Sequence, residues 1–233
     1  MIILKKLFIW DIDGTLIDCG ASGKQALESS FESSYSINNA LININLAGKL
    51  DYNIINAVVE KNNINDFKWN DFLKVYTTKL KENLLYNKKF KILDNTLRNL
   101  KLISKNEKFI NAIATGNSEV GAIVKLKNAD LLKYFRILSC GDSFETRKHL
   151  VQNAINISQA RVDNEIYKKN IYMIGDTPDD IIAGKNNNIK TIAIASGSYS
   201  RDILKKYKPD YLFDKLPSDL IKTISGGDNE KKD

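Results

Sequence analysis

Two aspartates separated by one residue, Asp11 and Asp13, directly follow an apolar run and have the best spacing in the chain for chemistry. If residues 7–11 form a strand, period-two alternation places both carboxylates on the same side of the chain as it leaves the sheet. Two carboxylates this close cannot both ionise without cost unless a cation compensates them or one stays protonated. Both conditions suit phosphoryl transfer. Asp11 can attack phosphorus to form an aspartyl-phosphate, and Asp13 can protonate the leaving oxygen and then deprotonate a water.

The Asp-x-Asp-Gly pattern is also typical of calcium-binding loops, in which carboxylates alternate along a turn and another follows at the twelfth position. Counted from Asp11, that position is occupied by Ser22, which is a poor substitute. The apolar run before Asp11 also predicts a strand, whereas such a loop connects two helices. The calcium interpretation is therefore disfavoured.

A second candidate site ends the apolar run 109–116, where Thr115, Gly116 and Asn117 follow one another. The Thr115 hydroxyl and the backbone amides of Gly116 and Asn117 could bind phosphate oxygens. Taken alone, this tripeptide is more often plain turn chemistry. The interpretation of these residues as a phosphate-binding site therefore depends on the other motifs in the chain.

A third group of polar residues, 175–180, also follows an apolar run. Asp176 would supply a further carboxylate to a hard cation such as Mg²⁺, and Asp180 could support it from behind. Asp179 and Asp180 could instead favour the start of the next helix through its dipole. That alternative leaves Asp176 unexplained.

The elements that must position these residues alternate along the chain between short apolar runs and helical stretches. This alternation predicts an α/β fold with a mostly parallel, doubly wound sheet. Ligands bind at the carboxyl ends of the strands in such sheets, which is where the three polar groups lie. The strands are expected at 7–11, 109–116, 171–176 and 191–196, with weaker ones at 136–139 and 211–213, and the helices at 94–105, 120–132, 147–157 and 179–186.

Residues 21–89 differ from the rest because they contain helical periodicity and no convincing strand. Amphipathic stretches at about 23–35, 51–61 and 70–85 are joined by Asn-rich turns, so we expect an inserted helical unit. The tail, 226–233, is charged and contains glycine, and we expect it to be flexible.

The composition narrows the class of protein. The formal charge is +7 with a pI near 9.1, but the lysines are spread along the chain, so we expect no nucleic-acid partner. Cys19 and Cys140 are far apart and only one histidine is present, which supports neither a disulfide framework nor a zinc site. No run is long enough to span a membrane. We expect a cytoplasmic protein that is a monomer or a weak homodimer.

The three motifs, in this order, resemble those of the haloacid dehalogenase-like hydrolase superfamily, and the resemblance spans nearly the whole chain. It implies a Rossmann-like catalytic core at 1–16 and 90–225, and a helical cap at 17–89 that closes over the site. It also implies Mg²⁺ as cofactor. The implied residues are Asp11 as nucleophile, Asp13 as acid and base, Thr115 with Gly116 and Asn117 on phosphate, and Asp11, Asp13 (through its carbonyl), Asp176 and Asp180 at the metal.

The family also has a lysine or arginine that neutralises the phosphate, and here the candidates are Arg147 and Lys148. The segment 141–147 resembles a subgroup that uses arginine, which favours Arg147. Neighbouring helix positions point about 100° apart, so only one of the two is expected to reach the site. The segment 48–51 resembles a part of the cap that faces the substrate, so Lys49 is either a substrate contact or a solvated helix lysine.

Asp13 also separates the reactions found in this superfamily. Carbon–halogen cleavage needs no acid at this position, whereas phosphomonoester hydrolysis needs one for its alkoxide leaving group. We therefore expect a phosphatase acting on a small phosphorylated metabolite of the phosphoglycolate or sugar phosphate class. The alternatives are a phosphomutase of the β-phosphoglucomutase kind and a non-catalytic binding protein that keeps the fold.

Overall fold

The computed structural model describes residues 5–44, 46, 48–142, 144, 146–162 and 166–227. Its centre is a parallel six-stranded sheet in the order β5-β4-β1-β6-β7-β8. The chain builds outward from β1 in one direction and then in the other, so the sheet is doubly wound. The strands are β1 (Lys6–Trp10), β4 (Phe109–Ala114), β5 (Leu138–Ser139), β6 (Ile171–Gly175), β7 (Lys190–Ile194) and β8 (Tyr211–Phe213).

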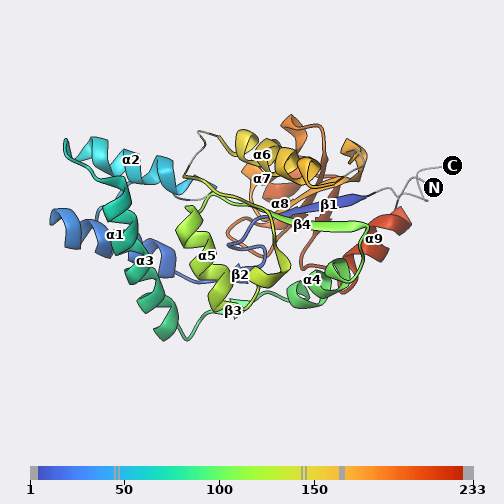
Figure 1. Ribbon diagram of the computed structural model, residues 1–233, viewed down its shortest axis with the longest axis horizontal. Coiled ribbons are helices and arrows are strands. Elements are labelled where there is room, and N and C mark those ends of the chain that lie inside the picture. Colours follow the sequence, from blue (N-terminus) through green and yellow to red (C-terminus); the bar gives the residue numbers. More distant parts are fainter. Residues whose placement is uncertain are drawn as a thin grey trace.

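Helices cover both faces of this sheet (Figure 1). Phe8 and Trp10 of β1 belong to one buried cluster, and Leu7 and Ile9 belong to the cluster on the opposite face. A central parallel strand is buried on both sides, which is why β1 is almost continuously apolar. The first face holds α4 (Thr96–Ser104), α5 (Glu119–Asn128) and α9 (Leu220–Gly227), and the second holds α6 (Arg147–Ala160) and α7 (Pro178–Asn186). Leu204 of α8 (Arg201–Lys206) packs on Ile181 of α7.

The remaining helices form a group at the opposite end of the molecule from α9 (Figure 1). They are α1 (Ser22–Tyr35), α2 (Asp51–Lys61) and α3 (Trp69–Tyr86), and they surround their own apolar cluster. The rings of Phe31 and Phe72 lie 4.5 Å apart in its centre. The chain enters and leaves this group through a short antiparallel ribbon of β2 (Ile17–Asp18) and β3 (Lys91–Ile92).

The expected fold class is confirmed, since all six expected strands pair in one sheet. The ribbon β2–β3 and helices α8 and α9 were not expected, and two short 3-10 helices, Leu132–Tyr134 and Lys168–Asn170, complete the elements. Gly226 and Gly227 are the last residues of α9, and 228–233 lie outside the described residues, so the flexible tail at 226–233 stays a prediction. The domain division at 16/17 and 89/90 stays a prediction. In the described part of the chain, no helix combines the length and apolar character needed to cross a bilayer.

Candidate active site

Three neighbouring strands bring the predicted residues together. Asp11 follows β1, Thr115 follows β4 and Asp176 follows β6, and these strands are adjacent in the order β4-β1-β6. Their carboxyl ends open into a cavity of about 640 Å³. Eight of the predicted site residues line it: Asp11, Asp13, Lys49, Thr115, Gly116, Asn117, Arg147 and Asp176.

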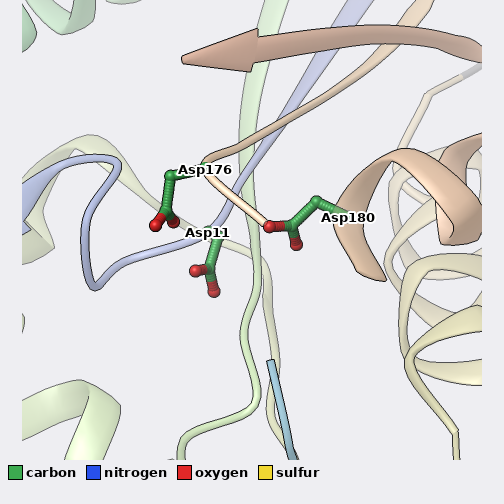
Figure 2. Close-up of side chains that lie close together, drawn as sticks. All are labelled: Asp11, Asp176 and Asp180. Carbon is green, nitrogen blue, oxygen red and sulfur yellow. The ribbon is translucent and has the colours of Figure 1, made fainter. Parts of the chain in front are cut away.

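Three buried carboxylates, those of Asp11, Asp176 and Asp180, lie close together at the carboxyl ends of β1 and β6 (Figure 2). One oxygen atom from each of Asp11, Asp176 and Asp180 lies within 4.8 Å of the others. Burial raises the pKa of Asp11 to about 7. The charge of Arg147 lowers this pKa, and the Asp180 and Asp13 carboxylates raise it further. Burial, reinforced by the Asp11 and Asp180 charges, also raises the pKa of Asp176 well above its ordinary value. The single guanidinium of Arg147 therefore does not balance the three carboxylates.

This cluster fits a hard divalent cation. Carboxylate oxygens are the ligands that Mg²⁺ prefers, and a cation would offset the repulsion that raises both pKa values. In addition, Oδ1 of Asp11 is buried and accepts no hydrogen bond from the described residues, which leaves a lone pair for a ligand bond. Asp11 and Asp176 are the members of the cluster that also line the cavity. That Mg²⁺ binds here stays a prediction, as does the expected contribution of the Asp13 carbonyl.

Asp180 has a different environment from the other two carboxylates. Its Oδ1 pairs with Nη1 of Arg147, and its Oδ2 accepts hydrogen bonds from the backbone and hydroxyl of Thr177, at 3.1 and 2.7 Å. The bond from the Thr177 amide, together with one from the Asp180 amide to the Thr177 hydroxyl, forms a capping box that starts α7, with Pro178 in its first turn. Both oxygens of Asp180 are thus engaged by protein donors. This favours the supporting role expected for Asp180 over direct metal ligation.

Of the two candidate cations, Arg147 reaches the site. It is the first residue of α6, its side chain is 9% exposed, and its Nη1 lies 3.3 Å from Oδ1 of Asp11. Lys148 is exposed and does not line the cavity. Within the segment 141–147 that resembles the arginine subgroup, positions 143 and 145 lie outside the described residues.

Two glycines leave space for the Asp176 carboxylate. A Cβ atom added to Gly14 or Gly197 would collide with the Asp176 side chain. Gly14 also has φ +76°, a conformation that suits glycine. The hydroxyl of Thr15 donates to Oδ1 of Asp176 at 3.2 Å, so the carboxylate is held from several sides.

Asp13 has partners that the sequence did not reveal. Its Oδ2 lies 2.6 Å from Nζ of Lys125 and 2.8 Å from Nδ2 of Asn117, and its Oδ1 accepts from the Cys19 thiol at 2.9 Å. Burial would raise the pKa of Asp13, but the Lys125 charge and these hydrogen bonds lower it below its ordinary value. Lys125 was missed, although Ala122 and Leu126 place position 125 near the apolar face of the helix. A charged residue on that apolar face is the sequence signal that could have identified Lys125.

The loop of Thr115, Gly116 and Asn117, which is predicted to bind phosphate, is joined to the start of α2. The backbone amide of Asp51 donates to the Gly116 carbonyl at 2.7 Å, and Oδ2 of Asp51 accepts from the Ser118 amide at 2.8 Å. Lys49 lies two residues before Asp51, and its exposed side chain borders the cavity. In the loop itself, Oγ1 of Thr115 accepts from Nδ2 of Asn117 at 2.8 Å, so its hydrogen can point at a ligand.

Comparisons with known proteins agree with this geometry. The family described as haloacid dehalogenase-like hydrolase matches residues 8–194. The chain is 32% identical to the pyrophosphatase PpaX of Bacillus mycoides over 43% of this chain and 45% of the relative. It is 26% identical to the phosphoglycolate phosphatase of Agrobacterium fabrum over 50% of each chain. Each match thus spans about half the length of the curated relative.

Among solved structures, CbbY from Rhodobacter sphaeroides in complex with phosphate aligns with a TM-score of 0.69. The alignment covers 91% of this chain and 95% of that one, at 14% identity, which supports the fold alone. The family match carries the assignment because it runs from within β1 to the end of β7 and contains all three polar motifs. The chain therefore belongs to the haloacid dehalogenase-like hydrolase family.

Proposed function

We propose that this protein is a Mg²⁺-dependent phosphomonoester hydrolase that acts on a small phosphorylated metabolite through an aspartyl-phosphate intermediate. The observation that carries the proposal is the buried group of Asp11, Asp176 and Asp180 beside Arg147, which opens into the same cavity as Asp13. It combines a nucleophile, sites for a cation, and an acid and base. Bound Mg²⁺ would neutralise charge on the carboxylates and on the substrate phosphate.

In the first step, a carboxylate oxygen of Asp11 attacks phosphorus and the bond from phosphorus to the ester oxygen breaks. Asp13 gives its proton to the departing oxygen, so an alcohol leaves. In this proposal Thr115 donates its hydroxyl to a phosphate oxygen, and the Arg147 guanidinium supplies positive charge beside Asp11. The amides of Gly116 and Asn117 are the further donors proposed for the phosphate.

In the second step, water attacks the phosphorus of the aspartyl-phosphate and the bond from phosphorus to the Asp11 oxygen breaks. Asp13, now a carboxylate, takes the proton of that water. Inorganic phosphate leaves and Asp11 is regenerated. The contacts of Asp13 with Lys125 and Asn117 favour its carboxylate form, which suits this step. The proton that Asp13 takes from water here is the one that it gives to the leaving oxygen in the next turnover.

The names of the relatives support a phosphate substrate, because one is a phosphoglycolate phosphatase and one a pyrophosphatase. A phosphoglycolate or sugar phosphate class of substrate remains our proposal for this chain. Lys49 on the cap side of the cavity is the proposed substrate contact outside the phosphate site. The buried, unpaired thiols of Cys19 and Cys140 are compatible with the cytoplasmic location we propose. We also propose that the protein is a monomer or a weak homodimer and that it has no nucleic-acid partner.

The test is a screen of the purified protein against a panel of metabolite phosphates, with Mg²⁺ and with EDTA. We expect phosphate release from at least one phosphomonoester, loss of release in EDTA, and recovery when Mg²⁺ is restored. Absence of phosphate release across a broad panel, together with salt-dependent RNA binding, would support a non-catalytic binding protein instead.

A phosphomutase would use the same two aspartates, so the screen includes a second measurement. The protein is incubated with glucose 1-phosphate and a trace of the bisphosphate. Phosphate release without isomerisation supports the hydrolase. Formation of glucose 6-phosphate without free phosphate would overturn it.

A further inference from the structure

Lys125 is a buried lysine at the junction of the core and the helical group α1–α3. It lies on α5 with only 5% of its side chain exposed, and its Nζ is 2.6 Å from Oδ2 of Asp13 and 2.5 Å from Oδ1 of Asn117. Nδ2 of Asn117 donates to the same Asp13 oxygen at 2.8 Å. The three side chains thus form a closed triangle of hydrogen bonds.

The ammonium is enclosed by elements from both parts of the chain. A Cβ atom added to Gly23 of α1 would lie 3.4 Å from Nζ of Lys125, and the negative charges of Asp13 and Asp51 act on it. Burial alone would lower the pKa of Lys125, but these charges raise it well above its ordinary value, so the side chain stays an ammonium. A buried ammonium is costly unless it is paired, so its place is tied to that of its partners.

The position of Asp13 indicates what this arrangement does. Both side chains line the cavity, but that of Asp13 is 38% exposed and that of Lys125 only 5%, so Asp13 is the more accessible of the two to a substrate. A carboxylate on a loop has rotamers that point elsewhere, and misplacement by about 1 Å can reduce a rate by about 100-fold. Lys125 and Asn117 hold Oδ2, and the Cys19 thiol holds Oδ1, so the carboxylate is fixed at both oxygens.

We propose that Lys125 is a positioning residue that fixes the Asp13 carboxyl group for proton transfer to the leaving oxygen and from the attacking water. The inference rests on the proposed phosphatase function. A purely structural role is a different proposal. A buried ion pair that only stabilises the fold can often be replaced, both partners together, by apolar side chains without loss of stability. The positioning role also differs from phosphate binding, in which Lys125 would contact substrate directly and act on every phosphate ester alike.

The leaving group separates these roles. An alkyl phosphate needs a proton from Asp13 when its alkoxide departs, whereas p-nitrophenyl phosphate releases a stable phenolate without one. The experiment compares kcat/KM for p-nitrophenyl phosphate and for the alkyl phosphate that the wild type hydrolyses best, in the wild type and in Lys125→Met. We expect a loss of about 100-fold on the alkyl ester and less than about 5-fold on the aryl ester. The ratio of the two values does not depend on the fraction of correctly folded protein.

Two further variants complete the experiment. Lys127→Met changes an exposed lysine on the same helix and should leave both values unchanged. In an Asp13→Asn background, Lys125→Met should have no further effect on the alkyl ester, because the group that it positions is absent. If Lys125→Met does not fold, Lys125→Gln, which keeps a donor, takes its place in the same comparison.

Equal losses on both esters, or an additive effect in the Asp13→Asn background, would overturn the positioning role while leaving the phosphatase assignment intact. Unchanged kinetics in Lys125→Met would also overturn it. If the wild type hydrolyses neither ester nor any other phosphomonoester, the proposed function fails and this inference fails with it.

Discussion

The guanidinium of Arg147 pairs with the Asp180 carboxylate and places the same Nη1 atom 3.3 Å from Oδ1 of Asp11. It thus places positive charge beside the proposed nucleophile. We expect Arg147→Met to reduce phosphate release by about 100-fold or more, since it removes positive charge where the transferring phosphate would lie. The free energy of unfolding should fall by about 3–5 kcal/mol in urea titrations, because buried carboxylates lose their partner.

The neighbouring Lys148 provides the matched control. Its side chain is exposed and lies outside the cavity, so Lys148→Met should keep the activity and stability of the wild type. A large loss of activity in Lys148→Met, with Arg147→Met still active, would reverse the assignment of the phosphate-neutralising cation.

We expect Asp11→Asn to abolish turnover without unfolding the protein. The amide cannot act as the nucleophile, but it has the same shape and removes one negative charge from a crowded cluster. Arg147 keeps its partner Asp180. Phosphate release and circular dichroism measure the two properties separately. An Asp11→Asn protein that still hydrolyses esters would rule out the covalent mechanism.

The fold and the central carboxylates follow from local sequence patterns. Asp11, Thr115 and Asp176 each follow an apolar run, and a parallel sheet brings the ends of such runs to one edge. No long-range information is needed to place them. The short ribbon β2–β3 was not predicted, because two residues per strand are too few for an alternating pattern to be seen.

Two features of the site could not be predicted from periodicity, although the resemblance of the segment 141–147 favoured Arg147 for one of them. The choice between Arg147 and Lys148 depends on where α6 starts, because an error of one residue rotates a side chain by about 100°. The contact of Lys125 with Asp13 depends on how α1 and α3 pack against α5, across a sequence separation of 112 residues. Helical periodicity marks position 125 as buried but says nothing of its partner.

The free energy of unfolding of the metal-free protein should fall as the pH rises towards about 7, because the carboxylate cluster loses its protons. The pKa of Asp11 is raised from 3.8 to about 7 in the folded protein, so the folded state holds a proton that the unfolded chain has released. This contribution is fully present below the unfolded value and is lost as the pH rises through the folded one. Thermal denaturation with EDTA across this range measures it.

Mg²⁺ should oppose that loss because it competes with protons for the same carboxylates. We expect Mg²⁺ to raise the melting temperature more at about pH 8 than at about pH 5.5, where the cluster holds protons. In Asp176→Asn the effect of Mg²⁺ should shrink at both pH values. An equal rise at both pH values in the wild type would show that Mg²⁺ binds elsewhere.

The Cys19 thiol should react slowly with iodoacetamide in the folded protein. Burial raises the pKa of Cys19 to about 12, so only about one thiol in ten thousand is ionised at about pH 8. Mass spectrometry of the labelled peptide measures the rate, and urea-unfolded protein gives the reference. Labelling of folded Cys19 at the unfolded rate would mean that the thiol is not the donor to Asp13.

Gly197→Ala tests whether the position of Asp176 depends on the space that this glycine leaves. The added methyl group would collide with the Asp176 carboxylate, and either the loop or the carboxylate must move. We expect weaker Mg²⁺ binding, measured as a smaller rise in melting temperature, and a fall in activity of about 10-fold or more.

The control is Gly226→Ala in α9, where an added Cβ meets nothing within 4 Å. That change should leave Mg²⁺ binding intact and stabilise the helix by up to about 1 kcal/mol. Equal Mg²⁺ responses in the two variants would show that Asp176 does not need the space beside Gly197.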